Sequence, residues 1–167
     1  LPLLRSSRIL AGLQISNFFS QLAHVVLPSM AVLYASYRFD WDVKSVGLML
    51  AVVGVCSMAV QGAGIGPIVK RLGESKALLI GLVFGVLGFF VYGVAPTGIL
   101  FCLGIPVTAL WGVSGAATQA LMTREVAADQ QGQLQGATAS VQSVSQMLGP
   151  LLFTLIFAFF IGEHAPF

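Results

Sequence analysis

Five long apolar stretches dominate this sequence, and no charged residue interrupts any of them. An α-helix needs about 20 mostly apolar residues to cross the hydrocarbon core of a bilayer. All 14 charged side chains lie outside the five stretches. The predicted membrane-spanning helices cover residues 9–37, 46–69, 77–95, 99–122 and 134–161. The sequence therefore predicts an all-α, polytopic membrane bundle of about five helices that is surrounded by a lipid bilayer.

The overall composition argues against a soluble fold. Of the 167 residues, 57% are apolar and 8% are charged, whereas a soluble globular domain carries about 25% charged residues. A chain with so little charge cannot cover a water-exposed surface, which argues against a soluble enzyme and against a nucleic-acid partner. Membrane-spanning strands alternate apolar and polar residues, but stretch 77–95 is apolar on all sides apart from Tyr92. Helices are therefore favoured over strands.

The links between the stretches are too short to contain a soluble domain. They cover residues 38–45, 70–76, 96–98 and 123–133. We therefore expect a single transmembrane domain over residues 1–167. A bundle with an odd number of helices would end at an outer loop, 162–167, that leads toward a sixth helix. This favours a fragment, or half, of a larger protein.

The basic residues predict the orientation of the chain, because cytoplasmic loops carry an excess of lysine and arginine. One side of the bundle holds Arg5, Arg8, Lys70, Arg71, Lys76 and Arg124. The other side holds only Arg38 and Lys44. The N-terminus is therefore predicted to be cytoplasmic.

A polar stripe runs along the first stretch. It consists of Gln14, Asn17, Gln21 and His24. At 100° per residue these four positions fall within about 80° of one another. Polar groups inside a membrane usually face a bundle interior or a water-filled cavity. The stripe is interpreted either as interhelical glue or, as we favour, as the lining of a cavity for a polar or amphipathic solute.

His24 has two further interpretations. Its ordinary titration range would suit a proton relay, but no acidic partner lies within the spans. A histidine whose hydrogen bonds are satisfied inside the bundle is therefore favoured over a relay.

The fifth stretch repeats the polar pattern. Gln135, Thr138, Gln142 and Gln146 share one face, and Gly149 and Pro150 follow. Proline inside a helix removes a backbone hydrogen bond and clashes with the preceding turn. Pro150 is therefore expected to mark a kink, which is either purely structural or part of a gate.

The remaining stretches differ in their polar content. The second has Ser57 and Gln61 on one face, and the fourth carries Trp111 in the middle of the membrane. Trp111 is either part of the packed core or an aromatic wall for a flat ligand. The third stretch has no polar stripe, and its glycines at 81, 85 and 88 permit close helix approach.

The sequence lacks the residue groups that enzymes and cofactor proteins use. Paired carboxylates, a Cys/His cluster and a phosphate-binding loop are all missing. We therefore expect no enzyme activity, no catalytic residue, no metal and no cofactor.

Two groups of motifs resemble a known transporter family. Residues 66–76 (GPIVKRLGESK) resemble the short basic inter-helix loop of the major facilitator superfamily. Residues 131–136 (QGQLQG) and 149–153 (GPLLF), together with 38–41 (RFDW), are similar to the C-terminal half of its tetracycline-exporter subfamily of drug/proton antiporters. The resemblance covers about residues 5–161.

The resemblance implies helices seven to eleven of a twelve-helix carrier, with the N-terminal half and the last helix absent. The missing N-terminal half of the same transporter is therefore an expected partner. In that family the ninth helix packs outside the central cavity, which agrees with the missing polar stripe in stretch 77–95. The sequence departs from tetracycline exporters at Gly85, where they carry a buried acid, and near Ser57, where they can carry a histidine. These departures weaken the expectation of tetracycline as substrate and suggest that proton coupling resides in the N-terminal half.

The resulting functional prediction is a proton-coupled exporter of a small amphipathic or drug-like molecule in a bacterial inner membrane, working by alternating access. The alternatives are a uniporter or importer on the same fold, or a non-transporting membrane scaffold. The candidate substrate-binding residues are Gln14, Asn17, Gln21, His24, Gln61, Trp111, Gln142 and Gln146. The candidate gating and cytoplasmic-loop residues are Lys70, Arg71, Arg124 and Pro150.

Overall fold

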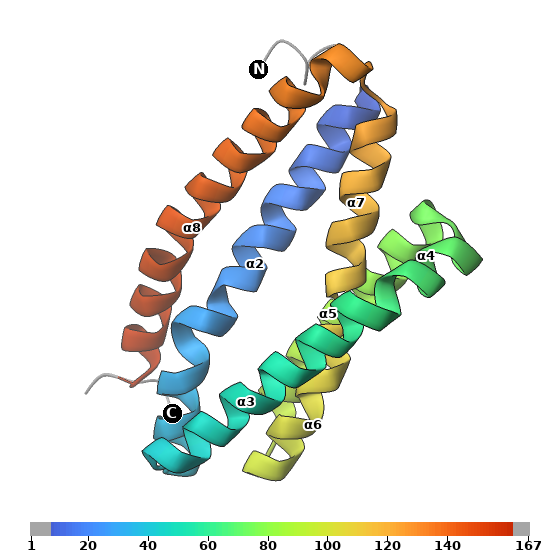
Figure 1. The fold of residues 1–167 in the computed structure, drawn as a ribbon. Coiled ribbons are helices and arrows are strands. Elements are labelled where there is room, and N and C mark those ends of the chain that lie inside the picture. The colour runs from blue at the N-terminus through green and yellow to red at the C-terminus, as the bar shows by residue number, and fades with distance from the viewer. Residues whose placement is uncertain (1–7, 162–167) are drawn as a thin grey trace. The chain divides into compact units, whose positions relative to one another are not determined.

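The computed structural model describes residues 8–161, and these are folded into helices joined by short turns (Figure 1). The predicted outer loop at 162–167 and Arg5 lie outside the described residues. Within the described part, five helices are long and apolar enough to cross a membrane. They span Arg8–Phe39, Val43–Leu72, Glu74–Val94, Gly98–Arg124 and Ala128–Ile161. The prediction of an all-α bundle of five membrane-spanning helices is confirmed.

Three of the five long helices consist of shorter elements. The first and third long helices are α2 (Arg8–Phe39) and α5 (Glu74–Val94). The second consists of α3 (Val43–Ala59), the π-helical turn η1 (Val60–Gly64) and α4 (Ile65–Leu72). The fourth consists of α6 (Gly98–Ala109) and α7 (Gly112–Arg124). The fifth consists of the short 3-10 turn η2 (Ala128–Gln130) and α8 (Gln131–Ile161).

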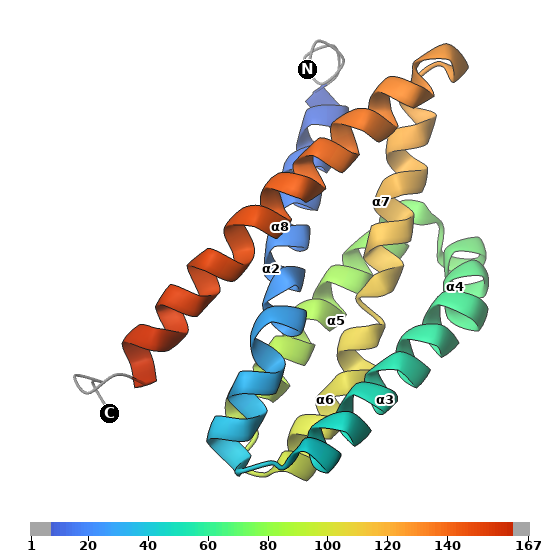
Figure 2. The same cartoon turned by 60° about the vertical axis from the view of Figure 1, so that its left-hand side comes forward.

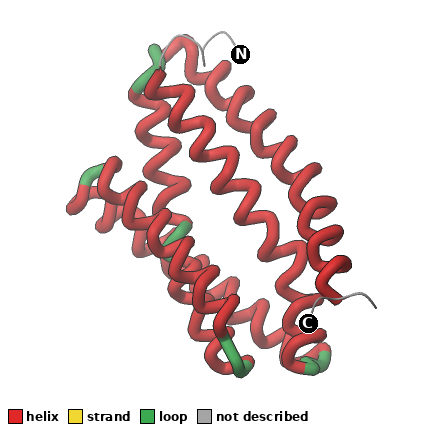
Figure 3. The backbone as a smooth tube through the Cα atoms, turned by 180° about the vertical axis from the view of Figure 1, so that it is seen from behind, coloured by secondary structure: helices red, strands yellow, loops and turns green. Residues whose placement is uncertain are grey.

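Most helix ends extend beyond the predicted apolar spans. Basic residues occupy the last turns of α2, α4 and α7, and Glu74 begins α5. These charges complement the helix dipole, which favours cations at C-termini and anions at N-termini. The links are consequently very short, as the loop segments in Figure 3 show.

The chain divides into two compact units. The first contains α2 up to Tyr34 together with the segment that begins at Glu125 and includes α8. The second contains residues 35–124. In the second unit α5 packs against both α6 and α7, and α3 packs against α6 (Figure 2).

Glycines allow α5 to approach α6 and α7 closely. A Cβ atom on Gly81 would lie 2.5 Å from the backbone nitrogen of Ser114. A Cβ atom on Gly85 would lie 2.9 Å from the Trp111 ring. Gly88 faces Thr108 in the same way. The predicted role of these glycines in helix packing is confirmed, because any side chain at these positions would push the helices apart.

The fourth span is broken in the middle, whereas the sequence predicted a continuous helix over 99–122. The break falls at Leu110 and Trp111, between α6 and α7. There the Trp111 backbone N–H donates to the Thr108 carbonyl at 2.9 Å, and the Ser114 backbone N–H donates to the Trp111 carbonyl at 2.9 Å. Both bonds reach back three residues, so the chain is wound more tightly there than an α-helix. Pro106, one turn earlier, has no N–H to donate.

The second span contains a π-helical turn that the sequence analysis did not predict. At its end the Ile65 N–H donates to the Val60 carbonyl, five residues earlier. Val60 and Ile65 both pack against the small buried cluster of Ala77, Val113 and Ala117. In a regular α-helix, residues five apart would point about 140° apart. The wider turn absorbs one extra residue and thereby brings both side chains onto the same packing face.

A turn with a defined backbone conformation connects α2 to α3 within the second unit. Asp40 adopts a left-handed backbone conformation with φ 53°, which aspartate tolerates better than most residues. Asp42 then caps α3, because its side chain accepts a hydrogen bond from the Ser45 N–H at 2.9 Å. Between these aspartates, the Trp41 ring lies against Gly98 at the start of α6.

A single glycine separates α4 from α5. Gly73 has φ 77°, a conformation that costs side-chain-bearing residues free energy. Its N–H donates to the Val69 carbonyl at 2.9 Å and so closes α4. The predicted basic loop at 70–76 is therefore a sharp turn in which Lys70 and Arg71 belong to the last turn of α4.

The helices of the first unit, α2 and α8, run parallel. Gln14 bonds Thr138, and Gly149 lies against Val25. In each pair the two partners are 124 residues apart in the sequence. The two helices therefore keep the same register along their whole contact. A Cβ atom on Gly149 would lie 2.7 Å from a Val25 methyl carbon, so Gly149 permits the close approach. The assigned helix α8 continues through Pro150 without a break.

Candidate functional site

The polar stripe predicted on α2 changes steadily in exposure along the helix. Gln14 and Asn17 are buried, with exposed fractions of 4% and 8%. Gln21 is half-buried and His24 is exposed. The stripe therefore runs from an exposed end at His24 to a buried end at Gln14.

A hydrogen bond fixes the buried end of the stripe. The Gln14 amide nitrogen Nε2 donates to the Thr138 hydroxyl oxygen of α8 at 2.9 Å. The parallel register of α2 and α8 brings these two side chains together. Thr138 was noted in the sequence as part of the polar face of 134–161, but it was not among the predicted binding residues. The sequence signal for Thr138 is that stretches 9–37 and 134–161 both carry polar side chains at helical spacing on one face.

Two polar atoms at this end are buried and have no hydrogen-bond partner. They are the Gln14 oxygen Oε1, which is an acceptor, and the Asn17 nitrogen Nδ2, which is a donor. Burying a polar group without a partner costs free energy, commonly about 1–3 kcal/mol. Such atoms call for an explanation, and a site that accepts a ligand or an ordered water is one.

Besides His24, three of the predicted binding residues are exposed. Gln142 and Gln146 lie on the exposed part of α8, and Gln61 lies exposed in η1. The structure joins Gln14 to Thr138 by a hydrogen bond but leaves these three glutamine side chains uncovered. In a helix at membrane depth, exposed amides require a polar partner or water.

Trp111 is buried, with an exposed fraction of 6%. Its ring lies against Gly85 and meets the Phe89 ring edge-on, with centroids 5.5 Å apart. It ends a run of neighbouring rings that begins at the α2–α3 turn. The run consists of Phe39, Trp41, Phe101, Tyr92, Phe89 and Trp111, with successive centroids 4.7 to 6.5 Å apart. Trp111 thus packs inside the second unit, and contact with a flat ligand stays a prediction.

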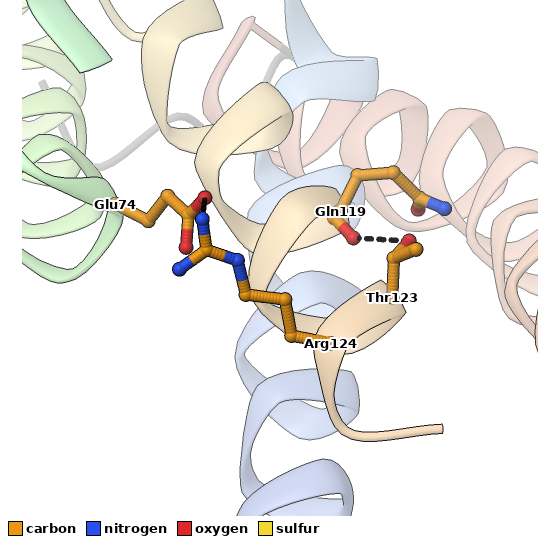
Figure 4. Close-up of polar contacts among 4 residues, drawn as sticks. All are labelled: Glu74, Gln119, Thr123 and Arg124. Carbon is orange, nitrogen blue, oxygen red and sulfur yellow. Dashed lines mark hydrogen bonds and ion pairs between the residues drawn. The ribbon is translucent and has the colours of Figure 1, made fainter. Parts of the chain in front are cut away.

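One ion pair links two helix ends in the second unit (Figure 4). The Arg124 guanidinium, at the end of α7, lies 2.7 Å from the Glu74 carboxylate at the start of α5. Each charge also suits the dipole of its own helix. The sequence did not predict this pairing of Glu74 with Arg124. Lys70 and Arg71, the other predicted loop residues, are exposed.

A third buried polar atom without a partner lies on α7, about one and a half turns before Arg124. The Gln119 side-chain nitrogen Nε2 has no hydrogen-bond partner. The backbone carbonyl of Gln119 accepts a hydrogen bond from the Thr123 hydroxyl at 2.8 Å (Figure 4). The Gln119 amide is therefore a further polar group available in the second unit.

Comparison with known proteins gives the family. Residues 3–165 match the family model of the Major Facilitator Superfamily. The chain is 34% identical to the tetracycline resistance protein, class C, of Escherichia coli over 92% of this chain and 39% of that protein. It is 34% identical to the class G protein of Vibrio anguillarum over 84% of this chain and 36% of that protein.

The similarity extends beyond bacteria. The chain is 29% identical to the human Hippocampus abundant transcript 1 protein over 89% of this chain and 30% of that protein. A comparison with solved structures finds no significant match. The chain spans between 30% and 39% of the length of these three relatives. The match over nearly all of its residues shows that this chain belongs to the major facilitator superfamily.

Proposed function

We propose that this chain is part of a secondary transporter that exports a small amphipathic or drug-like molecule by proton-coupled alternating access. The observation that carries the proposal is the buried polar pair Gln14 and Asn17 in an otherwise apolar helix. The similarity to tetracycline resistance proteins supports export. In secondary transporters of this kind, two repeats move around a binding site near the bilayer midplane.

We further propose that the chain corresponds to helices seven to eleven of such a carrier and works with its other half. The relatives are more than twice as long as the matched region. Gln61, Gln142 and Gln146 are exposed, and amides at membrane depth are costly without polar contacts. Facing the other half across a shared cavity would supply those contacts.

Each candidate residue receives a role in this proposal. Gln14, Asn17, Gln21, Gln61, Gln142 and Gln146 would offer hydrogen bonds to the solute, His24 would lie at the exposed end of the α2 stripe, and Trp111 would add an aromatic wall. Lys70 and Arg71 would anchor the cytoplasmic end of α4, and Arg124 would tie α7 to α5. Pro150 would provide a point of bending in α8.

The proposed location is a bacterial inner membrane with the N-terminal end of this chain in the cytoplasm. The excess of basic residues on one side supports this orientation. Acidic side chains occur only at or beyond the ends of the spans, so the protonated group is proposed to lie in the remainder of the carrier.

The proposal is tested with the full-length parent protein in everted membrane vesicles. A pH gradient is imposed, and its collapse is followed on addition of cationic and planar aromatic drugs, including tetracyclines. Collapse is expected for a subset of these compounds. If no compound collapses the gradient although insertion is confirmed, a uniporter, an importer or a scaffold replaces the antiporter.

A pair of double variants tests the binding residues. Gln21→Leu with Gln142→Leu should abolish most of the drug-induced collapse while leaving membrane insertion unchanged. The matched control is Gln131→Leu with Gln133→Leu, which removes two exposed glutamines at the start of α8 and should transport normally. Undiminished transport by the first pair would contradict the cavity assignment.

A further inference from the structure

The buried end of the α2 stripe presents one free acceptor and one free donor. These are Gln14 Oε1 and Asn17 Nδ2, each without a partner. Residues three apart on a helix are surface neighbours, with Cβ atoms about 5–6 Å apart. The two side chains are therefore neighbours on one face of α2.

The hydrogen bond to Thr138 leaves the oxygen of the Gln14 amide free in this structure. The Thr138 hydroxyl accepts the hydrogen bond from Gln14 Nε2 at 2.9 Å, which occupies the donor end of the amide and leaves Oε1 as the available acceptor. Thr138 is thus a positioning residue that acts through Gln14. A side chain whose orientation is held by a second residue is typical of a built binding site.

We propose that Gln14 and Asn17, with Gln14 oriented by Thr138, form a binding site for a neutral group that carries a donor and an acceptor side by side, a primary amide or a hydroxyl. The proposal rests on the transport function proposed above and names the chemistry that this part of the site selects. Such a group would donate to Gln14 Oε1 and accept from Asn17 Nδ2. A bare cation would leave the Asn17 donor unpaired, and a carboxylate would leave the Gln14 acceptor unpaired.

The exposure gradient supplies a route to this site. Exposure falls from His24 through Gln21 to the buried pair. A solute that follows the α2 stripe from its exposed end exchanges water for side-chain hydrogen bonds at each turn. The last positions, Asn17 and Gln14, are where water is excluded and hydrogen bonds discriminate best between ligands.

The same donor and acceptor could instead hold one internal water, which also donates and accepts. The experiment separates the two sources with purified full-length protein in lipid nanodiscs. Binding of 2-naphthamide is compared with binding of N,N-dimethyl-2-naphthamide, which keeps the carbonyl acceptor but lacks the N–H donors. The variants are Asn17→Leu and Thr138→Val, and the control is Ser140→Ala, an exposed hydroxyl of α8.

We expect the wild-type protein and Ser140→Ala to bind the primary amide at least ten-fold more tightly than the dimethyl amide. Thr138→Val should lower this preference to less than three-fold, because it releases the Gln14 amide whose oxygen accepts from the probe N–H. Asn17→Leu should weaken the binding of both probes several-fold, because both carbonyls would accept from Asn17 Nδ2. No binding, equal binding of both probes by the wild type, a preference unchanged in Thr138→Val, or affinities unchanged in Asn17→Leu overturns the proposal. Unchanged affinities with raised thermal stability in Asn17→Leu would indicate a water site only.

The readout also separates this proposal from the proposed function, because binding is measured without a gradient. Drug-induced collapse of the pH gradient with equal binding of the two probes would leave transport standing and remove the amide site. Selective amide binding without gradient collapse by any compound would retain the site and remove drug/proton antiport.

Discussion

The Arg124 guanidinium lies 2.7 Å from the Glu74 carboxylate and so ties the C-terminus of α7 to the N-terminus of α5. The two side chains differ in their surroundings, since Arg124 is 73% exposed and Glu74 is 12% exposed. The ion pair closes the same helix–helix contact that Gly81 begins about two turns further into α5.

Breaking this ion pair should lower stability modestly. Double-mutant cycles on exposed ion pairs commonly give about 0.2–1 kcal/mol, so Glu74→Gln with Arg124→Met should show a coupling energy in that range. Thermal unfolding of the full-length carrier at low and high salt measures it, because salt screens exposed charges. The charge swap Glu74→Arg with Arg124→Glu should restore only part of the loss, since each charge then opposes its helix dipole. Complete restoration would show that the dipoles contribute nothing.

Gly81→Ala should destabilise the α5–α7 contact. The new methyl group would lie 2.5 Å from the Ser114 backbone nitrogen, and a backbone cannot move aside as a side chain can. Overpacking of this kind costs about 1–3 kcal/mol. The thermal midpoint of the full-length protein in detergent should fall accordingly.

Gly93→Ala is the matched control in the same helix. A Cβ atom at Gly93 meets nothing within 4 Å, and alanine is favoured over glycine in helices by about 1 kcal/mol. Its midpoint should therefore stay unchanged or rise. A similar loss in both variants would indicate that the close contact at Gly81 is not what limits stability.

Asp42 should make the start of α3 sensitive to acid. Hydrogen bonds from the Ser45 hydroxyl and the Ser45 backbone N–H lower the pKa of Asp42 below its ordinary value of 3.8. A carboxylate whose folded-state pKa is lowered stabilises the fold above its ordinary pKa. That contribution is lost as the pH falls from 3.8 through the lower folded-state value.

The test compares Asp42→Asn with Asp42→Ala between pH 7 and pH 2. Asparagine can still accept the Ser45 N–H bond but does not titrate, so its stability should vary less with pH than that of the wild type. Alanine should be less stable than both at pH 7 because it loses the cap. A wild-type acid profile that Asp42→Asn leaves unaltered would assign the pH dependence to other groups.

Deleting Ala63 should be tolerated, although deletions inside helices usually are not. The deletion converts the π turn at Val60–Gly64 into a regular α turn and leaves Val60 and Ile65 four residues apart, still on one face. Deleting Val52 instead rotates the preceding turns by about 100° and moves Met49, which is 2% exposed, out of its packing. Expression and thermal midpoint should therefore fall only for the Val52 deletion. Equal loss in both would show that the extra residue is required for folding.

Hydropathy and periodicity were sufficient to predict the membrane fold. Charged side chains are strongly disfavoured in the hydrocarbon core of a bilayer. The 14 charges between the apolar stretches therefore predict where five helices cross the membrane. The glycines of 77–95 were also predicted correctly as a packing surface, because a helix repeats its faces every 3.6 residues. These are local properties of the chain.

Features that depend on two segments meeting were not predicted. The break at Leu110 and Trp111 depends on how α6 and α7 pack against α5, and the π turn depends on a cluster contributed by α5 and α7. Similarly, neither sequence segment alone reveals that Glu74 pairs with Arg124.

The sequence by itself determined that residues 8–161 contain five helices long and apolar enough to cross a membrane, and its motifs resembled the family to which the chain belongs. Only the tertiary structure decided that Thr138 orients Gln14, that Gln14 Oε1 and Asn17 Nδ2 are left without partners, and that Trp111 is buried against Gly85. The physical reason is whether an interaction involves one segment of the chain or two. Burial in a bilayer acts on each helix separately, whereas a hydrogen bond or a close contact depends on the register between two helices.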